Sequence, residues 1–229
     1  MIYNIISTGS KGNAVIIDYR ILVDCGVSFI KLKPYCRNFD VVLLTHFHSD
    51  HFNQRTIRLL AEERPTLRFG CGTWMVGLLL ACGVPYENID TYQMDTVYKY
   101  SDELSVEPFT LYHNVENCGY KIYSNNRKAI YATDTKQILT EALDFDLYLI
   151  EANYGEEELQ QRIEDKLFKG HGYIYELGLE ERHLSEEQAR DFIIRNIGIN
   201  GKYEYLHRHK EREVFDEKED AEKPETDGR

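Results

Sequence analysis

Short apolar runs separated by turn-forming residues dominate the first third of the chain. Each run is rich in β-branched or aromatic side chains and is bounded by Gly, Asp, Asn or Pro, which is typical of strands. Strands are therefore expected at Tyr3–Ser7, Ala14–Tyr19, Arg20–Asp24, Val41–Thr45 and Leu67–Cys71. Helices are expected at Asn53–Glu63 and at Thr73–Ala81, the second ending at Gly83. The pattern predicts a β-rich layer with helices beside it.

The second half of the chain repeats this order of strands and helices. Strands are expected at Thr96–Tyr100, Leu104–Leu111, Asn117–Ser124, Ala129–Thr133 and Leu147–Ala152. Helices are expected at Thr135–Ala142, Glu156–Leu167 and Ser185–Asn196, and the last begins with the capping-box pattern of Ser185 and Gln188. Two rounds of strands followed by helices predict two sheets stacked face to face, with helices on the outside.

Length and composition indicate one domain with a charged tail. The chain has 229 residues, enough to bury a sizeable core. Residues 1–209 are expected to form the domain, and residues 210–229 a disordered tail, because the latter have five Lys/Arg, nine Asp/Glu and few apolar residues. His207 and His209 lie at the start of this tail and are expected to be solvated side chains.

Charge and cysteine usage narrow the class of protein. The net charge of −12 argues against gross non-specific binding to nucleic acid, although residues 1–68 carry nine Lys/Arg against six Asp/Glu and allow a local basic rim. No apolar run is long enough to span a membrane, and the N-terminus lacks the pattern of a signal peptide. The five cysteines include no Cys-x-x-Cys pair. We therefore expect free thiols and a cytoplasmic location.

The strongest chemical signal is the segment Thr45–His51, directly after the buried run Val41–Leu44. It contains His46, His48, Asp50 and His51. His46 and His48 are two residues apart and point the same way on an extended segment, and Asp50 and His51 follow where the chain turns. Imidazole nitrogens and a carboxylate are ligands for Zn²⁺ or a similar ion. The segment predicts one pair of ligands for each of two ions.

Three later residues complete the predicted site. His113 ends a strand, Asp134 follows a strand, and His183 precedes a capped helix. The predicted sets are His46, His48, His113 and Asp134 for one ion, and Asp50, His51, Asp134 and His183 for the other. Histidine ligation favours Zn²⁺, although Mn²⁺ or Fe also suits such a site. The alternative for these three residues is a loop polar group, a turn cap or a backbone hydrogen bond.

Three other residues are weaker candidates for binding substrate. Lys11 lies in the glycine turn Thr8–Asn13 and could meet a phosphate, but a solvated lysine is the simpler interpretation. His171 lies in a glycine-flanked loop, where most histidines are inert. Asn153 and the nearby Glu151 either orient ligands from behind or cap a strand.

The motifs together resemble the metallo-β-lactamase superfamily over nearly the whole chain. Within it, the chain resembles the WalJ/YycJ-type exonuclease branch. The resemblance rests on Thr8–Asn13, Asp24-Cys25-Gly26, Thr45–His51, Thr133-Asp134-Thr135, Leu149–Asn153 and His183-Leu184-Ser185. It implies an α/β fold, a four-layer αββα sandwich with the metals at one edge of its stacked sheets.

Two positions depart from the branch pattern. The branch has His-Asp after the Glu-x-Asn segment, where this chain has Tyr154-Gly155, and glycine before the late His-Leu-Ser, where this chain has Arg182. Both lie near the expected cleft, so substrate preference is affected while metal binding is not. The spacings among His113, Asp134 and His183 leave no room for a large nuclease cap domain or a long tRNA-binding arm.

The sequence therefore predicts a metal-dependent hydrolase that uses a metal-bound hydroxide, with Asp50 also exchanging protons with substrate oxygens. The first hypothesis is a phosphodiesterase on nucleic acid, a 5′ exonuclease in particular, with a nucleic acid or nucleotide as its partner. The second is a small-molecule phosphodiesterase, such as a cyclic-nucleotide hydrolase. A β-lactam hydrolase is disfavoured because no export signal is seen. A non-catalytic metal-binding module is the third hypothesis. The oligomeric state stays open.

Overall fold

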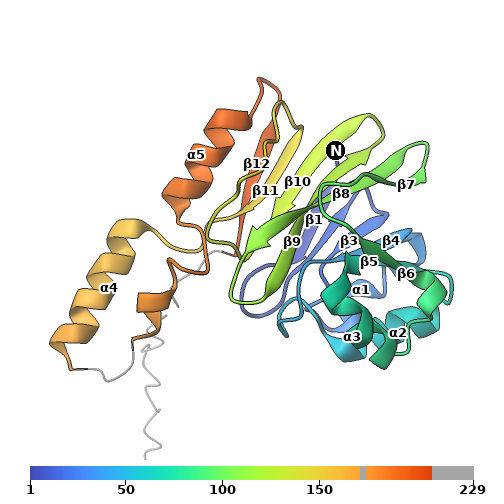
Figure 1. The fold of residues 1–229 in the computed structure, drawn as a ribbon, viewed down its shortest axis with the longest axis horizontal. Helices are drawn as coiled ribbons and strands as arrows, with labels where there is room; N and C mark the ends of the chain where they lie inside the picture. Colours follow the sequence, from blue (N-terminus) through green and yellow to red (C-terminus); the bar gives the residue numbers. More distant parts are fainter. Residues whose placement is uncertain (171–173, 208–229) are drawn as a thin grey trace, which may run out of the picture.

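Two six-stranded sheets form the centre of the molecule (Figure 1). A computed structural model describes residues 1–170 and 174–207. The first sheet runs in chain order through β1 (Tyr3–Ser7), β2 (Ala14–Ile17), β3 (Ile21–Val23), β4 (Val41–Leu44), β5 (Arg68–Gly72) and β6 (Ile89–Tyr92). Its first three strands pair antiparallel, and β3 to β6 pair parallel. Sequential strands are therefore neighbours throughout this sheet.

The second sheet has the order β12-β11-β10-β9-β8-β7. Its strands are β7 (Tyr98–Ser101), β8 (Leu104–Tyr112), β9 (Glu116–Ser124), β10 (Arg127–Ala132), β11 (Leu147–Glu151) and β12 (Lys202–Leu206). Strands β7 to β10 form an antiparallel meander, whereas β10, β11 and β12 are parallel. As a result β8, β10, β11 and β12 all end at the same edge of the sheet.

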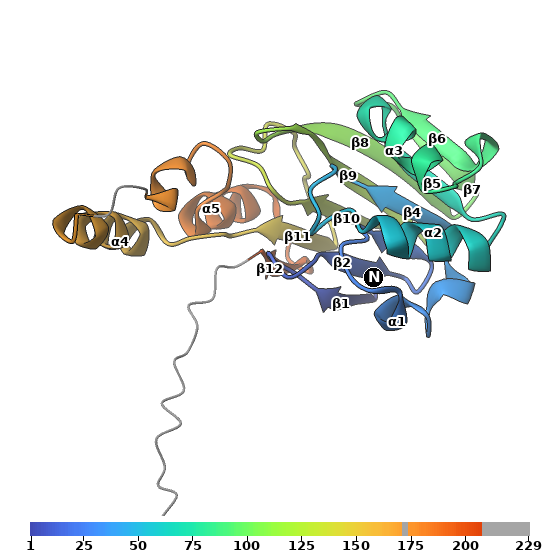
Figure 2. The same cartoon turned by 90° about the horizontal axis from the view of Figure 1, so that it is seen from below.

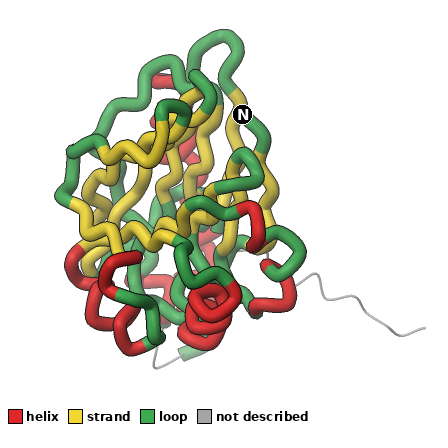
Figure 3. The backbone as a smooth tube through the Cα atoms, turned by 90° about the vertical axis from the view of Figure 1, so that its right-hand side faces the viewer, coloured by secondary structure: helices red, strands yellow, loops and turns green. Residues whose placement is uncertain are grey.

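Three apolar layers hold the sandwich together. Between the sheets, Val15 and Val23 of the first sheet share a layer with Tyr120 and Leu149 of the second. The outer face of the first sheet is covered by α1 (Phe29–Leu32), α2 (Gln54–Glu63) and α3 (Val76–Ala81), and that of the second by α5 (Glu186–Asn196). Strands lie inside and helices outside in Figure 3. The predicted four-layer αββα sandwich is confirmed.

Helix α4 (Glu156–Phe168) lies apart from these layers. Only Leu159 is buried along it, where it packs with Tyr154 and Leu179, and the helix extends away from the sheets (Figure 2). Its main contact is with η4, the short 3₁₀ turn Tyr175–Gly178. Together α4 and η4 form a projection between the end of β11 and the start of α5.

Most predicted elements are present, and one is wrong. The capping box at the start of α5 is confirmed: Ser185 Oγ accepts from Gln188 N at 3.0 Å, and Gln188 Oε1 accepts from Ser185 N at 2.9 Å. The helix expected at Thr135–Ala142 does not form. There the Thr135 amide donates to Glu151 and the Lys136 amide to the Tyr112 carbonyl, so neighbouring strands take the donors that a first helical turn would offer.

The structure also contains two strands that the sequence did not predict, and it tests the predictions on the cysteines and on membrane-spanning helices. Strands β6 and β12 were not expected, and β12 carries His207 into the interior. All five cysteines are buried and free, as predicted. The tail at 210–229 lies outside the described residues. Within the described part of the chain, no helix combines the length and apolarity needed to cross a membrane.

Close backbone packing joins the loops that follow β1, β3 and β4. The Asn13 amide donates to the Asp50 carbonyl at 2.6 Å, and the Gly26 amide donates to the Asn13 carbonyl at 2.9 Å. Gly12 has a φ of +124°, and a Cβ there would lie 2.5 Å from the Gly26 oxygen. A Cβ on Gly26 would lie only 1.7 Å from the Asp50 oxygen. Glycine is required at both positions for the Asp50 loop to approach.

Gly26→Ala should therefore displace the Asp50 backbone and lower the free energy of unfolding by about 2–3 kcal/mol, which chemical denaturation would measure. Gly77→Ala is the matched control, because a Cβ there meets nothing within 4 Å and the residue lies inside α3. That change should raise stability by about 0.5–1 kcal/mol. Equal stability of both variants would contradict the close packing inferred for Gly26.

Candidate metal centre

The residues of the candidate site follow strand ends at one edge of the sandwich. Strand β4 leads into His46 and His48, and a tight turn follows, in which the His51 and Phe52 amides both donate to the His48 carbonyl at 2.8 Å. This turn returns Asp50 and His51 toward the strand end. The second sheet contributes residues after β8, β10 and β12, whose carboxyl ends lie at the facing edge.

Left-handed backbone conformations direct three of the side chains. Asp24, Asp134 and His207 have φ values of 60°, 57° and 51°, and each lies within two residues of the end of β3, β10 or β12. This region is uncommon for residues other than glycine, although Asp, Asn and His enter it more readily. The Asn117 side-chain amide donates to the carbonyls of Thr133 (3.0 Å) and Asp134 (2.7 Å) and fixes one of these turns. Such local strain is typical of functional sites.

The first group of donors is His46, His48, His113 and Asp134. His46 Nε2 lies 3.0 Å from His48 Nδ1 and 3.6 Å from Asp134 Oδ2, and His113 Nε2 lies 3.3 Å and 3.8 Å from the same two atoms. Four ligands held about 2.0–2.1 Å from a tetrahedral Zn²⁺ would lie about 3.3 Å from one another. The observed spacings therefore fit one tetrahedral cation.

Hydrogen bonds on the far side of the rings fix which nitrogens face the site. His46 Nδ1 contacts Thr45 Oγ1 at 3.0 Å, and His113 Nδ1 donates to the Arg182 carbonyl at 3.0 Å. Because the Thr45 hydroxyl donates onward to Asp24 Oδ1 (2.9 Å), it accepts from His46. The Nε2 lone pairs of both rings therefore point inward, as metal ligation requires.

A second group of donors shares Asp134 with the first. It comprises Asp50, His51 and Asp134. His51 Nε2 lies 3.4 Å from Asp134 Oδ2 and 3.7 Å from Asp50 Oδ2. On its other side, His51 Nδ1 donates to Asp24 Oδ2 at 2.7 Å, and Asp24 also accepts from the Thr45 amide and the Tyr131 hydroxyl, each at 3.0 Å. The fully buried Asp24 thus orients His51 toward the site.

His207 belongs to this site, and the expectation of a solvated side chain is wrong. Only 8% of the residue is exposed. Its Nδ1 donates to Asp134 Oδ1 at 2.5 Å, and its Nε2 lies 4.0 Å from Asp50 Oδ2. The last strand β12 carries the residue inward, beside β11. His209 lies outside the described residues.

His183 lies in the same cluster but has a different main partner. Its Nδ1 donates to Glu151 Oε1 at 2.5 Å, and Glu151 is fully buried at the end of β11. Glu151 Oε2 accepts from the Thr135 amide at 2.9 Å, and Oε1 lies 3.4 Å from His207 Nδ1. Asp134, Glu151, His183 and His207 form a third group with metal-ligand spacing. This geometry therefore permits two roles for His183, the predicted role of a metal ligand and that of a proton donor oriented by Glu151.

Burial keeps the imidazoles of the first group neutral. It is the largest influence on His46, His48 and His113 and lowers the pKa of each ring below its usual value. Neutral imidazole is the form that binds a metal. These three rings are therefore in the ligating state at neutral pH.

Charge pairing dominates around Asp134. Burial alone would raise the Asp134 pKa, but His51 and His207 outweigh it and hold the pKa well below its usual value. Burial would likewise lower the pKa of His51, but Asp134 and Asp24 raise it well above its usual value. For His207, Asp134 outweighs burial and raises the pKa to about 10. The carboxylates that retain protons on these rings would also attract a divalent cation, whose binding would displace those protons.

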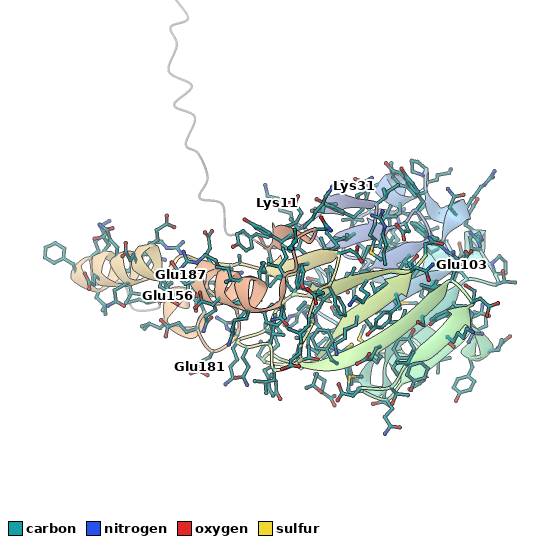
Figure 4. All side chains as sticks on the ribbon, turned by 90° about the horizontal axis from the view of Figure 1, so that it is seen from above. Lys11, Lys31, Glu103, Glu156, Glu181 and Glu187 are labelled. Carbon is teal, nitrogen blue, oxygen red and sulfur yellow. The ribbon has the colours of Figure 1, made fainter. Side chains whose placement is uncertain are left out.

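A cavity of about 370 Å³ opens onto these residues. Its described lining is Ser10, His48, Asp50, His113, Asn114, Asp134, Asn153, Tyr175, Leu179, Arg182, His183 and His207. Asn153 lies in this wall, and its side-chain amide donates to the His207 carbonyl at 3.2 Å. Lys11 is exposed on the outer surface (Figure 4), and its neighbour Ser10 lines the cavity instead. His171 lies outside the described residues.

Comparison with known proteins places this site in a family. Residues 19–194 match the model of the beta-lactamase superfamily domain. No curated protein sequence matches the chain significantly.

Three solved structures share the fold. The human tRNase Z, short form, has a TM-score of 0.68 at 14% identity, covering 90% of this chain and 92% of that one. The metallo-beta-lactamase fold protein YhfI from Bacillus subtilis has a TM-score of 0.65 at 16% identity, covering 90% and 85%. A diphosphatase from the PhnP family has a TM-score of 0.58 at 13% identity, also covering 90% and 85%.

At these identities the solved structures establish the fold alone. The family model covers most of the chain and includes the His46–His51 segment, His113, Asp134 and His183. The chain therefore belongs to the metallo-β-lactamase superfamily.

Proposed function

We propose that this protein is a phosphodiesterase that binds two divalent metal ions and acts on nucleic acid, as a 5′ exonuclease of the WalJ/YycJ type. The observation that carries the proposal is the pair of donor groups that share Asp134. Asp134 Oδ2 lies 3.6 Å from His46 Nε2 in one group and 3.4 Å from His51 Nε2 in the other. A carboxylate placed between two sets of inward-facing imidazoles suits a bridging ligand.

The donor chemistry fits Zn²⁺, with Mn²⁺ or Fe as alternatives. His46, His48, His113 and Asp134 would hold the first ion. Asp50, His51 and Asp134 would hold the second, and we assign its fourth ligand to His207 in place of the expected His183, because His207 lies between Asp134 and Asp50. When bound, such ions activate water at neutral pH and stabilise the charge that develops on phosphoryl oxygens.

His183 is then free to act on the leaving group. It lines the cavity, and Glu151 accepts from its Nδ1, which orients the ring so that Nε2 can hold the transferred proton. The leaving oxygen of the cleaved ester would take this proton. Asp50 lines the same cavity, and its other carboxylate oxygen, Oδ1, would accept a proton from the attacking water. No covalent intermediate on the protein is needed.

The choice of a phosphate ester as substrate has two supports. The solved structures that share the fold include a tRNase and a diphosphatase by name, which both indicate cleavage at phosphorus. The cavity wall also combines amides, a hydroxyl, a guanidinium and an aromatic ring, groups that bind phosphate, sugar and base. A cyclic-nucleotide hydrolase remains the alternative outcome of the substrate panel described below.

Asp24→Asn should weaken metal binding about 10- to 100-fold, because the amide has one accepting oxygen and no charge, so it cannot serve both the Thr45 donors and His51 Nδ1 as the carboxylate does. Asparagine tolerates the φ of 60° at this position, so the fold should persist. Competition with a chromogenic chelator would measure the affinity. Asp40→Asn, which removes only the ion pair with Arg20, is the matched control and should leave the affinity unchanged.

His207→Ala and His183→Ala should separate a ligand from a proton donor. We expect His207→Ala to lose about one equivalent of metal in elemental analysis. His183→Ala should retain both equivalents and lose about 10²- to 10⁴-fold in kcat. The reverse pattern, with metal lost from the His183 variant and retained in the His207 variant, would restore the ligand set predicted from the sequence.

Purified protein loaded with Zn²⁺ or Mn²⁺ should shorten 5′-labelled DNA, and chelation should abolish this activity until metal is returned. A panel of 5′- and 3′-labelled DNA, RNA, cyclic nucleotides and chromogenic phosphodiesters would measure preference and polarity. Cleavage of cyclic nucleotides alone would favour the small-molecule hypothesis. Inactivity on every member with two equivalents of metal bound would contradict the proposed reaction.

A further inference from the structure

Arg182 places a fixed positive charge in the wall of the metal-centre cavity. Among the described residues that line this cavity, it is the one lysine or arginine. Its backbone carbonyl accepts from His113 Nδ1, so its position is linked to the first donor group.

The guanidinium of Arg182 is held in place by the 3₁₀ turn η4. Its Nε donates to the Gly178 carbonyl at 2.8 Å, and its carbon lies 5.0 Å from the centre of the Tyr175 ring. Gly178 has no side chain to push against it, since a Cβ there would lie 3.1 Å from Nη2. The hydrogen bond to the Gly178 carbonyl, the Tyr175 ring and the close approach of the Gly178 backbone therefore fix the plane of the guanidinium before a ligand binds.

The remaining donors of Arg182 have no acidic partner. No carboxylate in the described part of the chain lies within 4.0 Å of its nitrogens, including Asp50 and Asp134 of the same cavity. Among the described residues only Nε has a hydrogen-bond partner, so toward this part of the chain the four hydrogens on the Nη atoms stay available. A planar pair of N–H groups matches two oxygens of a phosphate, and Arg is favoured over Lys for this contact.

Tyr175 adds a second recognition element beside this charge. Its side chain lines the cavity and is 46% exposed, although one face contacts Arg182. An exposed ring next to a phosphate-binding arginine is the arrangement with which proteins hold single-stranded nucleotides, through base stacking and phosphate contact.

We propose that Arg182, supported by Tyr175 and Gly178, binds a second phosphate of the substrate, one nucleotide away from the bond that is cleaved. This inference rests on the proposed phosphodiesterase function and narrows its substrate class. The preferred substrate is then a chain carrying two phosphates on adjacent nucleotides. Cyclic mononucleotides and simple diesters have a single phosphate and cannot use both the metal centre and Arg182.

Binding of short nucleotides to the metal-loaded protein tests this subsite separately from catalysis. The probes are phosphorothioate-linked dithymidine with a 5′-phosphate, with a 3′-phosphate and with neither, measured by isothermal titration calorimetry. We expect one of the phosphorylated probes to bind about tenfold tighter or more than the unphosphorylated one, because a hydrogen-bonded charge pair is formed. The side that carries the preferred phosphate gives the direction of the bound chain.

Arg182→Gln should reduce that preference to below about threefold, and Gly178→Ala should reduce it by a smaller factor. The first variant removes the charge, and the second displaces the guanidinium while leaving it present. Arg182→Lys should give an intermediate preference, since it retains charge without the planar fork. Arg190→Gln, a charge-matched change at an exposed site on α5, should retain the full preference.

Steady-state kinetics on the corresponding phosphodiester-linked dinucleotides, with and without the preferred terminal phosphate, gives a second readout. The Arg182 variant should raise KM for the phosphorylated substrate by about tenfold with a smaller change in kcat, whereas loss of folding would lower both activities together. Equal binding of all three probes to the wild-type protein, or a preference that persists in Arg182→Gln, would overturn the proposal. An Arg182-dependent preference without cleavage of any diester would instead retain the subsite and refute the proposed reaction.

Discussion

The buried carboxylate of Asp134 is the group around which the two halves of the molecule are assembled. Only 2% of this residue is exposed, and burial of an unpaired carboxylate would cost several kcal/mol. Its oxygens lie within 4 Å of ring nitrogens of His46, His51, His113 and His207, which follow strands of both sheets. The edge of the sandwich must therefore close so that these strand ends meet. Loss of the positive charge and N–H donors of His51 and His207 would leave Asp134 without compensation.

Local sequence patterns predicted an element well where the residues that define it lie close together in the sequence. Apolar runs gave nearly every strand, and the capping box of Ser185 gave the start of α5. The His46–His51 segment was identified because strand alternation and a tight turn place its donors together within a few residues. The helix expected at Thr135–Ala142 was wrong because its apolar spacing is helical, while the polar groups of Thr135 are bonded to β8 and β11. Tertiary hydrogen bonds of this kind leave no trace in a local pattern.

The place of His207 in the site could not be predicted, because its contacts are with residues far away in the sequence. Strand β12 has Tyr203 and Tyr205 in alternation with charged Lys202 and Glu204, yet a highly charged segment begins at Lys210 and hides that signal. His207 was therefore interpreted as part of the tail. His183 and His207 both end or precede regular elements, and sequence alone offers no reason to prefer one as a ligand. The register of β11 with β12, which sets Glu151 opposite Leu206, brings His207 close to Asp134 and Glu151. The bond from the Asn153 amide to the Leu184 carbonyl joins the segment of His183 to the end of β11, where Glu151 lies.

In the proposed function, the turns at the strand ends carry out the reaction, and the segment that follows α4 selects the substrate. Donors for the metal ions lie on turns that the two sheets hold rigidly, whereas Tyr175 and Arg182 belong to the segment after α4. Glu156 and Glu187 lie near each other at the first turns of α4 and α5, and Lys11 lies apart from them (Figure 4). A polyanionic chain would be repelled by the two glutamates and attracted by Lys11. Because Arg182 is the one lysine or arginine in the described cavity wall, we propose that it selects which phosphate of such a chain is held while its neighbour reaches the metal centre.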